Sequence, residues 1–248
     1  MVCALCLKEK ELHESHILPE FLYKDVYDPD HSFFSLSTAP EEPTKKHRKG
    51  IYEKLLCTDC EKIIGKYEDY AAKVLRGGIL ISVKQFPEKL LIGNLNYTQF
   101  KLFQMSLLWR AAVSSNRAFR YIELGPHAET MRKMLLTKTP GEPHKYGCLL
   151  FYSSTAHELM KRMIYPFEKM KKKIGGFQTY RAVLGGLMWA YIVSNRSHLF
   201  QHQPALLQKN GELPIFNAGP LGDKFIQGFA ADFKKAGKID EVLSRKKK

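Results

Sequence analysis

The chain has 248 residues, of which 44% are hydrophobic, and it carries a formal net charge of +14. This hydrophobic content is sufficient to bury a core, which argues against intrinsic disorder, and the length suggests one large domain or two small ones. The positive charge favours a polyanionic partner, nucleic acid ahead of an acidic membrane surface, with charge for solubility alone as the other explanation.

Two features of the chain predict a cytoplasmic protein. Only two residues precede Cys3, which leaves no room for the charged and apolar regions of a secretory signal peptide. The longest apolar stretch, 182–193, is about half as long as a bilayer-spanning helix and is interrupted by Gly185 and Gly186. We therefore expect no membrane span and no membrane partner.

Four of the five cysteines form two Cys-x-x-Cys pairs, Cys3 with Cys6 and Cys57 with Cys60. Each pair can present two sulfurs from one tight turn, and zinc prefers four such ligands in a tetrahedron. Because the second pair is expected at a helix start, the ion would join a knuckle to a helix N-terminus, as in a treble clef. We predict one structural zinc ion, without which residues 1–75 unfold.

Residues 1–76 are expected to form a small domain around this ion. A strand that ends at Pro19 comes first, and residues 28–50, rich in polar residues and proline, are expected to be an exposed loop. A second short strand, 51–56, leads into a helix that begins at Cys60. Arg76 followed by two glycines is typical of a helix C-terminus.

Residues 79–244 are expected to form a second body of mixed α+β structure, in which Thr98 is the N-cap of the first helix. The last residues, 245–248, are expected to be a solvated basic tail. The whole chain is therefore assigned to the α+β class. The predicted elements of the second body are a strand at 79–83, helices at 98–116 and 126–136, a buried strand at 146–153, a hairpin at 181–194 and a helix around 225–233.

Side chains of the second body have mainly structural interpretations. Cys148 lies in an apolar run and is expected in the core. Arg110, in the middle of a predicted helix, is expected to pair internally with a carboxylate. Tyr180, Trp189 and Tyr191 could stack on nucleic-acid bases only if they were exposed, and the apolar residues on both faces of their hairpin favour a core position.

A motif between the cysteine pairs suggests an activity. Ser-His-Ile-Leu-Pro closes the first strand, with His16 as its histidine, and Leu-Leu-Cys-x-x-Cys opens the helix. Together with the first cysteine pair, this pattern resembles the HNH (ββα-metal) endonucleases over about the first 75 residues. It is also similar, to about residue 120, to uncharacterised bacterial proteins described as HNH-like. A role in defence against foreign DNA is conjectured from the company that HNH modules keep.

The resemblance implies metal-dependent hydrolysis of phosphodiester bonds in DNA, or in RNA. It places the general base at His16 and a ligand of a Mg²⁺ or Mn²⁺ ion at Glu61, and Glu68 and Asp69, one or two turns further along the helix, could also reach the ion. The acidic residue that precedes the histidine in that family is Ser15 here, and the family's central asparagine has no counterpart, since no asparagine occurs before Asn94. These departures keep a second hypothesis open, a non-catalytic zinc module that binds nucleic acid or protein.

A basic run between the two strands is a candidate for phosphate contact. Lysine and arginine side chains beside His16 could hold a nucleic-acid backbone, and an ordinary solvated loop is the alternative. The sequence does not indicate an oligomeric state. The candidate residues are Lys45, Lys46, Arg48 and Lys49.

Overall fold

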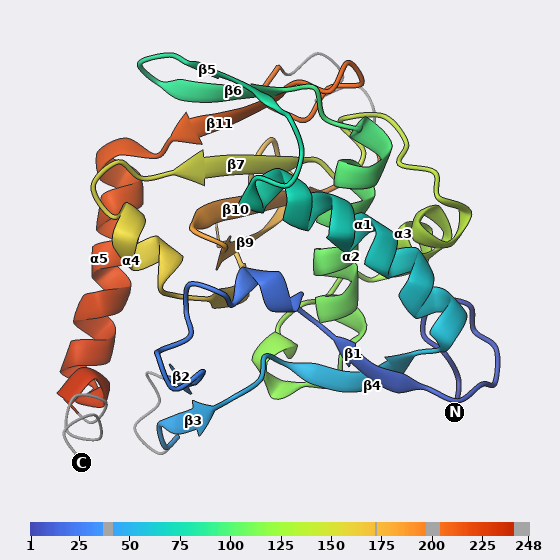
Figure 1. The fold of residues 1–248 in the computed structure, drawn as a ribbon, viewed down its shortest axis with the longest axis horizontal. Helices are drawn as coiled ribbons and strands as arrows, with labels where there is room; N and C mark the ends of the chain where they lie inside the picture. The colour runs from blue at the N-terminus through green and yellow to red at the C-terminus, as the bar shows by residue number, and fades with distance from the viewer. Residues whose placement is uncertain (37–41, 172, 197–203, 241–248) are drawn as a thin grey trace.

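A computed structural model describes residues 1–36, 42–171, 173–196 and 204–240 (Figure 1). Within these residues it contains one seven-stranded sheet, two two-stranded sheets and five α-helices, so the predicted α+β class is confirmed. No helix in this part of the chain has the length and apolar character needed to cross a membrane. The predicted basic tail at 245–248 lies outside the described residues.

The N-terminal part is a β-hairpin followed by a long helix. Strand β1 (His13–His16) pairs antiparallel with β4 (Tyr52–Leu56), and α1 (Thr58–Arg76) begins two residues after β4. The predicted strand and helix are confirmed, although the helix begins earlier than predicted because Cys57 occupies the N-cap position. The helix ends at Gly77, whose φ of 83° is the left-handed conformation that favours glycine.

The segment 28–50 is not simply an exposed loop, so this prediction is wrong. It contains a second small hairpin of β2 (Phe33–Ser35) and β3 (Lys45–His47). The Phe33 ring lies 5.4 Å from the ring of Tyr23 and 5.4 Å from that of His47, centroid to centroid. These aromatic contacts anchor one strand to the short 3₁₀ helix η1 (Glu20–Leu22) region, which the polar composition of the segment did not indicate.

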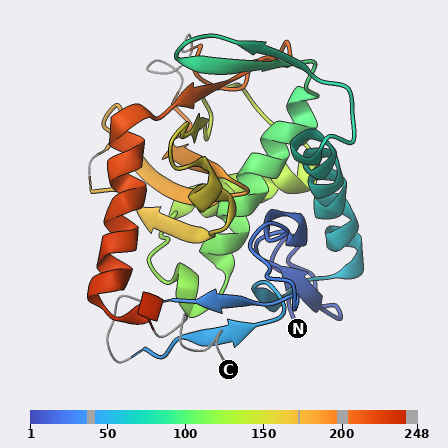
Figure 2. The same ribbon diagram turned by 60° about the vertical axis from the view of Figure 1, so that its left-hand side comes forward.

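Helix α2 (Tyr97–Val113) runs through the middle of the molecule, between α1 and the large sheet (Figures 1 and 2). Every residue from Phe100 to Ala111 is buried, including polar ones, so the helix is enclosed on all sides rather than amphipathic. The predicted N-cap at Thr98 is wrong. The cap is Asn96, whose side-chain oxygen accepts a hydrogen bond from the Gln99 N–H at 3.0 Å.

The large sheet has the strand order β5-β6-β11-β7-β10-β9-β8. Its predicted hairpin, β9–β10, is confirmed and turns at Gly185 and Gly186, both with positive φ. Strands β6, β8 and β11 were not predicted, because each mixes apolar with charged residues or proline. The strands are β5 (Ser82–Gln85), β6 (Lys89–Gly93), β7 (Cys148–Tyr152), β8 (Tyr165–Lys169), β9 (Gln178–Leu184), β10 (Leu187–Val193) and β11 (Leu213–Asn217).

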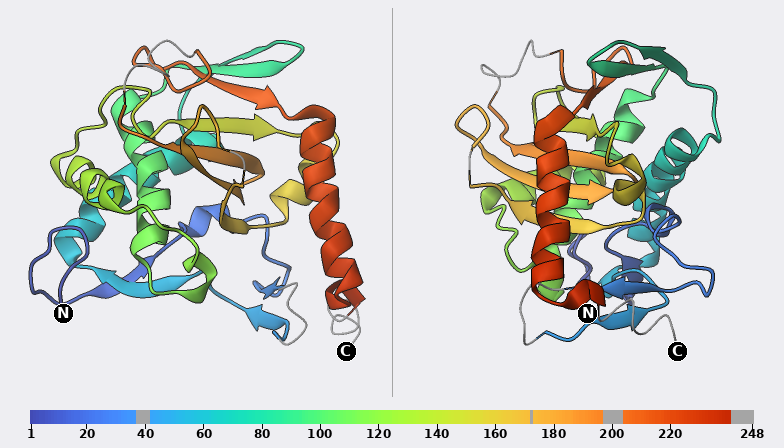
Figure 3. Two further views of the ribbon diagram at one scale, coloured as in Figure 1. Left: turned by 180° about the vertical axis from the view of Figure 1, so that it is seen from behind. Right: turned by 90° about the vertical axis from the view of Figure 1, so that its left-hand side faces the viewer.

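The remaining helices lie around this framework. Helix α3 (Pro126–Thr137) packs against α2, as the proline in its first turn predicted its start. Helix α5 (Gly219–Lys235) stands at one side of the molecule, beyond the ends of the strands (Figure 3). Two short helices complete the set, η2 (Arg117–Phe119) and α4 (His157–Lys161).

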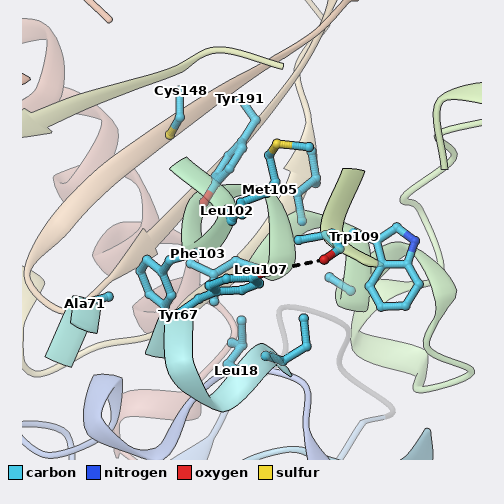
Figure 4. Close-up of a cluster of buried hydrophobic side chains, with 14 of the residues drawn as sticks. Leu18, Tyr67, Ala71, Leu102, Phe103, Met105, Leu107, Trp109, Cys148 and Tyr191 are labelled. Carbon is cyan, nitrogen blue, oxygen red and sulfur yellow. Dashed lines mark hydrogen bonds between the residues drawn. The ribbon is translucent and has the colours of Figure 1, made fainter. Parts of the chain in front are cut away.

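One cluster of buried side chains extends through both parts of the chain, from Cys3 to Ile215. Figure 4 shows Leu18 and Tyr67 of the N-terminal part in one cluster with Phe103 of α2 and Tyr191 of β10. Three candidates for base stacking are buried, with exposed fractions of 0%, 0% and 2% for Tyr180, Trp189 and Tyr191. They form part of the core, as does Cys148, so the expected core positions are confirmed.

Candidate metal centre and the surface around His16

The four cysteines of the two Cys-x-x-Cys pairs form one cluster. Their sulfur atoms all lie within 4.8 Å of one another, and three of the four residues are buried, with Cys6 half-buried. Cys3 and Cys6 flank the tight turn at the N-terminus, whereas Cys57 caps α1 and Cys60 lies in its first turn. The predicted convergence of these four residues is confirmed.

The chemistry of this cluster fits a zinc ion. Two sulfurs of a tetrahedral zinc site lie about 3.8 Å apart, and Cys6 Sγ lies 3.9 Å from Cys57 Sγ. The Cys57 N–H points to Cys3 Sγ at 3.3 Å, a contact that favours thiolate. When bound, the ion would be held by all four sulfurs and would join the N-terminal turn to the start of α1.

The pKa values of two thiols in the cluster are shifted in opposite directions. Burial alone would raise the pKa of Cys3, but backbone N–H groups of Cys6 and Cys57 outweigh it and lower the pKa to about 7. Burial and the neighbouring sulfurs raise the pKa of Cys60 well above its usual range. Four thiolates at this spacing therefore need a cation among them, which a zinc ion supplies.

His16 lies at the end of β1, on the edge of a small polar surface. Its ring lies against the ring of Tyr52, its partner across the hairpin, with 4.1 Å between the centroids. Its Nε2 lies 3.4 Å from Oε2 of Glu20, and its side chain is 31% exposed. The ammonium of Lys49 lies over the same Tyr52 ring, 5.8 Å from the centroid. The Tyr52 ring thus contacts both the His16 imidazole and the ammonium of Lys49, a residue of the basic run.

Glu61 lies on the other face of β1. The buried hydroxyl of Ser15 accepts a hydrogen bond from the Leu56 N–H at 3.1 Å and donates one to the Glu61 carboxylate. Consecutive residues of a strand point to opposite faces, so Ser15 and His16 lie on different sides of the hairpin. The structure therefore brings Glu61 to Ser15 and not to His16.

Glu68 is occupied by a cation from α2. Nη2 of Arg110 lies 2.5 Å from its carboxylate, and the Arg110 side chain is only 2% exposed. Nη1 of the same guanidinium donates to the backbone carbonyl of His16 at 2.5 Å. The expected internal pairing of Arg110 is confirmed, and this pair fixes the end of β1 through its backbone.

The ligand set expected for Mg²⁺ or Mn²⁺ is not assembled. In the described part of the chain, the four cysteines form the only group of three or more His, Cys, Asp and Glu side chains close enough to hold an ion. The requirement for a second metal ion stays a prediction of the resemblance. Glu20 and Tyr52 were not predicted as neighbours of His16. The i, i+4 spacing could have indicated Glu20, and the pairing register of the β1–β4 hairpin places Tyr52 opposite His16.

The basic run is exposed and has few acidic partners. Lys46 lies 3.9 Å from Asp30, and within the described residues Lys45, Arg48 and Lys49 form no ion pair. Lys45 and Lys46 are held on β3, whereas Arg48 and Lys49 follow it toward β4. These charges are therefore available for an anionic ligand.

Comparisons with protein-family models, with curated proteins and with solved structures gave no match for this chain. The resemblance to the HNH endonucleases therefore depends on the motif in the first 75 residues.

Proposed function

We propose that the zinc-bound hairpin and helix form a nucleic-acid phosphodiesterase of HNH type, with His16 as the general base. The observation that supports this proposal is the arrangement on Tyr52, whose ring contacts both the His16 imidazole and the Lys49 ammonium. The arrangement of elements also supports it: β1 pairs antiparallel with β4, α1 follows β4 directly, and the histidine lies at the end of β1, although η1, β2 and β3 separate the two strands in the chain.

The groups around His16 suit it to accept a proton. Nε2 and the nearest carboxylate oxygen of Glu20 are buried, lie 3.4 Å apart and have no hydrogen-bond partner within the described residues, so this carboxylate would stabilise a proton on Nε2, and Nδ1 would be the nitrogen that accepts a proton from water. The imidazole would take a proton from water, the resulting hydroxide would form a new bond to phosphorus, and the bond to the leaving oxygen would break. Lys49 and its neighbours would hold the phosphate.

A second candidate function is binding of nucleic acid without hydrolysis. It is favoured by the contacts of the two carboxylates, because Glu61 is hydrogen-bonded to Ser15 and Glu68 is paired with Arg110. Both candidates use the exposed basic run, and they differ in whether His16 performs chemistry. Action in defence against foreign DNA would apply to either and stays a prediction.

Cleavage assays separate the two candidates. Wild type, His16→Ala and His13→Ala are incubated with plasmid, single-stranded DNA and RNA in Mg²⁺ or Mn²⁺. His13 is the matched control because it lies on the same strand and its Nε2 contacts Thr58 Oγ1 at 2.7 Å, away from Tyr52. We expect His16→Ala to lose on the order of 100-fold in rate and His13→Ala to retain activity. Equal cleavage by all three proteins would contradict a catalytic role for His16.

Binding is measured separately, with zinc content checked for each variant. Lys45→Ala/Lys49→Ala should weaken binding and reduce the slope of log affinity against log salt by up to about 2. The control, Lys171→Ala/Lys173→Ala, removes two exposed lysines elsewhere and should leave the slope unchanged. Binding without cleavage by wild type would select the second candidate.

A further inference from the structure

Strand β5 is the outer strand of the seven-stranded sheet and lies at the end of the molecule opposite the zinc-bound hairpin (Figure 1). Three of the eight large hydrophobic side chains that are exposed in the described residues occur within this short region. They are Leu80, Val83 and Phe86, with exposed fractions of 92%, 54% and 39%. An open strand edge with apolar side chains is a site for pairing with another strand.

The hydrogen bonds within the sheet determine which residues of β5 face this open edge. Phe86 and Lys89 exchange both backbone hydrogen bonds, at 2.8 and 3.4 Å, so they form a hydrogen-bonded pair. Such pairs alternate along an antiparallel ladder. Given the β5–β6 register, Lys84 and Ser82 are therefore bonded to β6, whereas the N–H and C=O groups of Val83 and Gln85 point outward.

A proline on the next strand provides an independent check of this alternation. Pro214 of β11 lies opposite Leu91 of β6 and has no N–H to donate, so this pair is not hydrogen-bonded. Leu91 consequently directs its backbone groups to the other side, toward Lys84 of β5. The same assignment results from both sides of β6.

This alternation restricts how a second copy of β5 can pair with the first. Outward-facing residues must oppose outward-facing residues, so the pairing of two identical edges about a two-fold axis can be centred on Val83. In that register Leu80 lies opposite the partner's Phe86, at a position where cross-strand side chains approach most closely. Ser82 lies opposite the partner's Lys84.

The neighbouring registers that satisfy the same hydrogen-bond rule are poorer. A shift in one direction places Lys84 directly opposite the partner's Lys84 on the axis and Val83 opposite the partner's Gln85. A shift in the other direction places Leu80 opposite the partner's Lys84. Like charges directly opposite are destabilising, and an exposed leucine gains little from a lysine neighbour. Of these registers, the one centred on Val83 is the one that pairs the two apolar residues flanking β5, Leu80 and Phe86, with each other.

We infer that two copies of this chain form a symmetric dimer by antiparallel pairing of their β5 strands, with Val83 on the two-fold axis. The dimer joins two seven-stranded sheets into one continuous sheet. Because β5 and the β1–β4 hairpin lie at opposite ends of the molecule, the pairing leaves the surface around His16 uncovered (Figure 1). The dimer is therefore independent of the proposed nuclease function, and either can fail without the other.

Sedimentation analysis from about 1 to about 100 µM tests the dimer, since a contact of one strand pair is expected to be weak. Val83→Pro removes an N–H that faces the open edge and none that bonds to β6, so it should abolish dimer formation without changing the thermal midpoint appreciably. Val83→Thr keeps the N–H and the branched side chain and should still dimerise. A wild-type monomer over this whole range, or a dimer unaffected by Val83→Pro, would overturn the inference.

Cysteine cross-linking tests the register directly and does not depend on the proline variant. Val83→Cys places two thiols opposite each other across the axis, where a disulfide can form in a glutathione redox buffer. Gln85→Cys is the matched control. In this register Gln85 lies opposite the partner's Ile81, so the two introduced cysteines are separated along the strands and do not face each other. We expect at least tenfold more disulfide-linked dimer from Val83→Cys than from Gln85→Cys or wild type. Equal yields from the two variants would contradict this register.

Discussion

The buried guanidinium of Arg110 in α2 lies 2.5 Å from the Glu68 carboxylate in α1, and it also holds the backbone carbonyl of His16. Removal of the Glu68 charge would leave the buried Arg110 guanidinium without a compensating carboxylate. We predict that Glu68→Gln lowers the free energy of unfolding by about 3 kcal/mol, measured by urea denaturation. The double variant Glu68→Gln/Arg110→Met should be more stable than Glu68→Gln alone.

This result also bears on the role of Glu68. If the residue serves mainly to neutralise Arg110, its substitution changes stability more than the rate of cleavage by the folded fraction. Glu88→Gln, at a carboxylate that is 65% exposed, is the control and should leave the urea midpoint unchanged. A fully stable Glu68→Gln protein would refute the structural role.

Zinc content is the second prediction. Purified protein should contain one zinc ion per chain, and Cys57→Ser should lose it, because the four sulfurs act as one ligand set. Binding of a structural zinc ion contributes on the order of 10 kcal/mol, so removal by a strong chelator should unfold the hairpin and the start of α1. Since the core is continuous with α2, we also expect a lower thermal midpoint for the rest of the chain.

The control for the zinc experiment is Cys148→Ala. Cys148 is buried in β7 and takes no part in the cluster, so this variant should retain its zinc while losing some stability through the small cavity. Circular dichroism and a thermal midpoint that do not change in chelator would contradict a structural metal site.

Glu53 provides a prediction about pH. Burial opposes ionisation of this carboxyl, but hydrogen bonds from the Ser114 hydroxyl and the Ser115 N–H outweigh it and lower the pKa below its ordinary value of 4.5. A carboxyl with a lowered folded-state pKa stabilises the protein above its unfolded-state pKa and loses this contribution as the pH falls through the folded-state value. The stabilisation should therefore be complete at neutral pH and decline below about pH 4.5.

Glu53→Gln isolates this contribution. We expect the variant to be less stable than wild type by about 1 to 2 kcal/mol at neutral pH, and the difference to shrink as the pH is lowered toward 3. Loss of zinc at low pH affects both proteins, so the difference between them is the measured quantity. A difference that stays constant with pH would contradict the assignment.

The helix cap of α2 gives a fourth prediction. Asn96→Ala removes the acceptor of the Gln99 N–H and should cost about 1 kcal/mol in the free energy of unfolding. Thr98→Ala changes a residue inside the first turn and should cost less, which makes it the matched control. If Thr98→Ala were the more damaging of the two, the cap would be misassigned.

The sequence by itself determined the features that depend on short spacings. Two Cys-x-x-Cys pairs identified the cluster, because two sulfurs three residues apart converge from one turn. Gly185 and Gly186 identified the β9–β10 hairpin, because both adopt the positive φ that its turn requires. Neither inference needed knowledge of a distant part of the chain.

The tertiary structure decided which distant side chains meet. Glu61 and Glu68 both follow the second cysteine pair at helical spacing, but the partner of one is on β1 and that of the other is on α2. Strand β11 likewise lies between β6 and β7, far from either in sequence. Such contacts are set by packing of the whole core rather than by local conformational preference, which is why the surroundings of His16 could not be read from the motif alone.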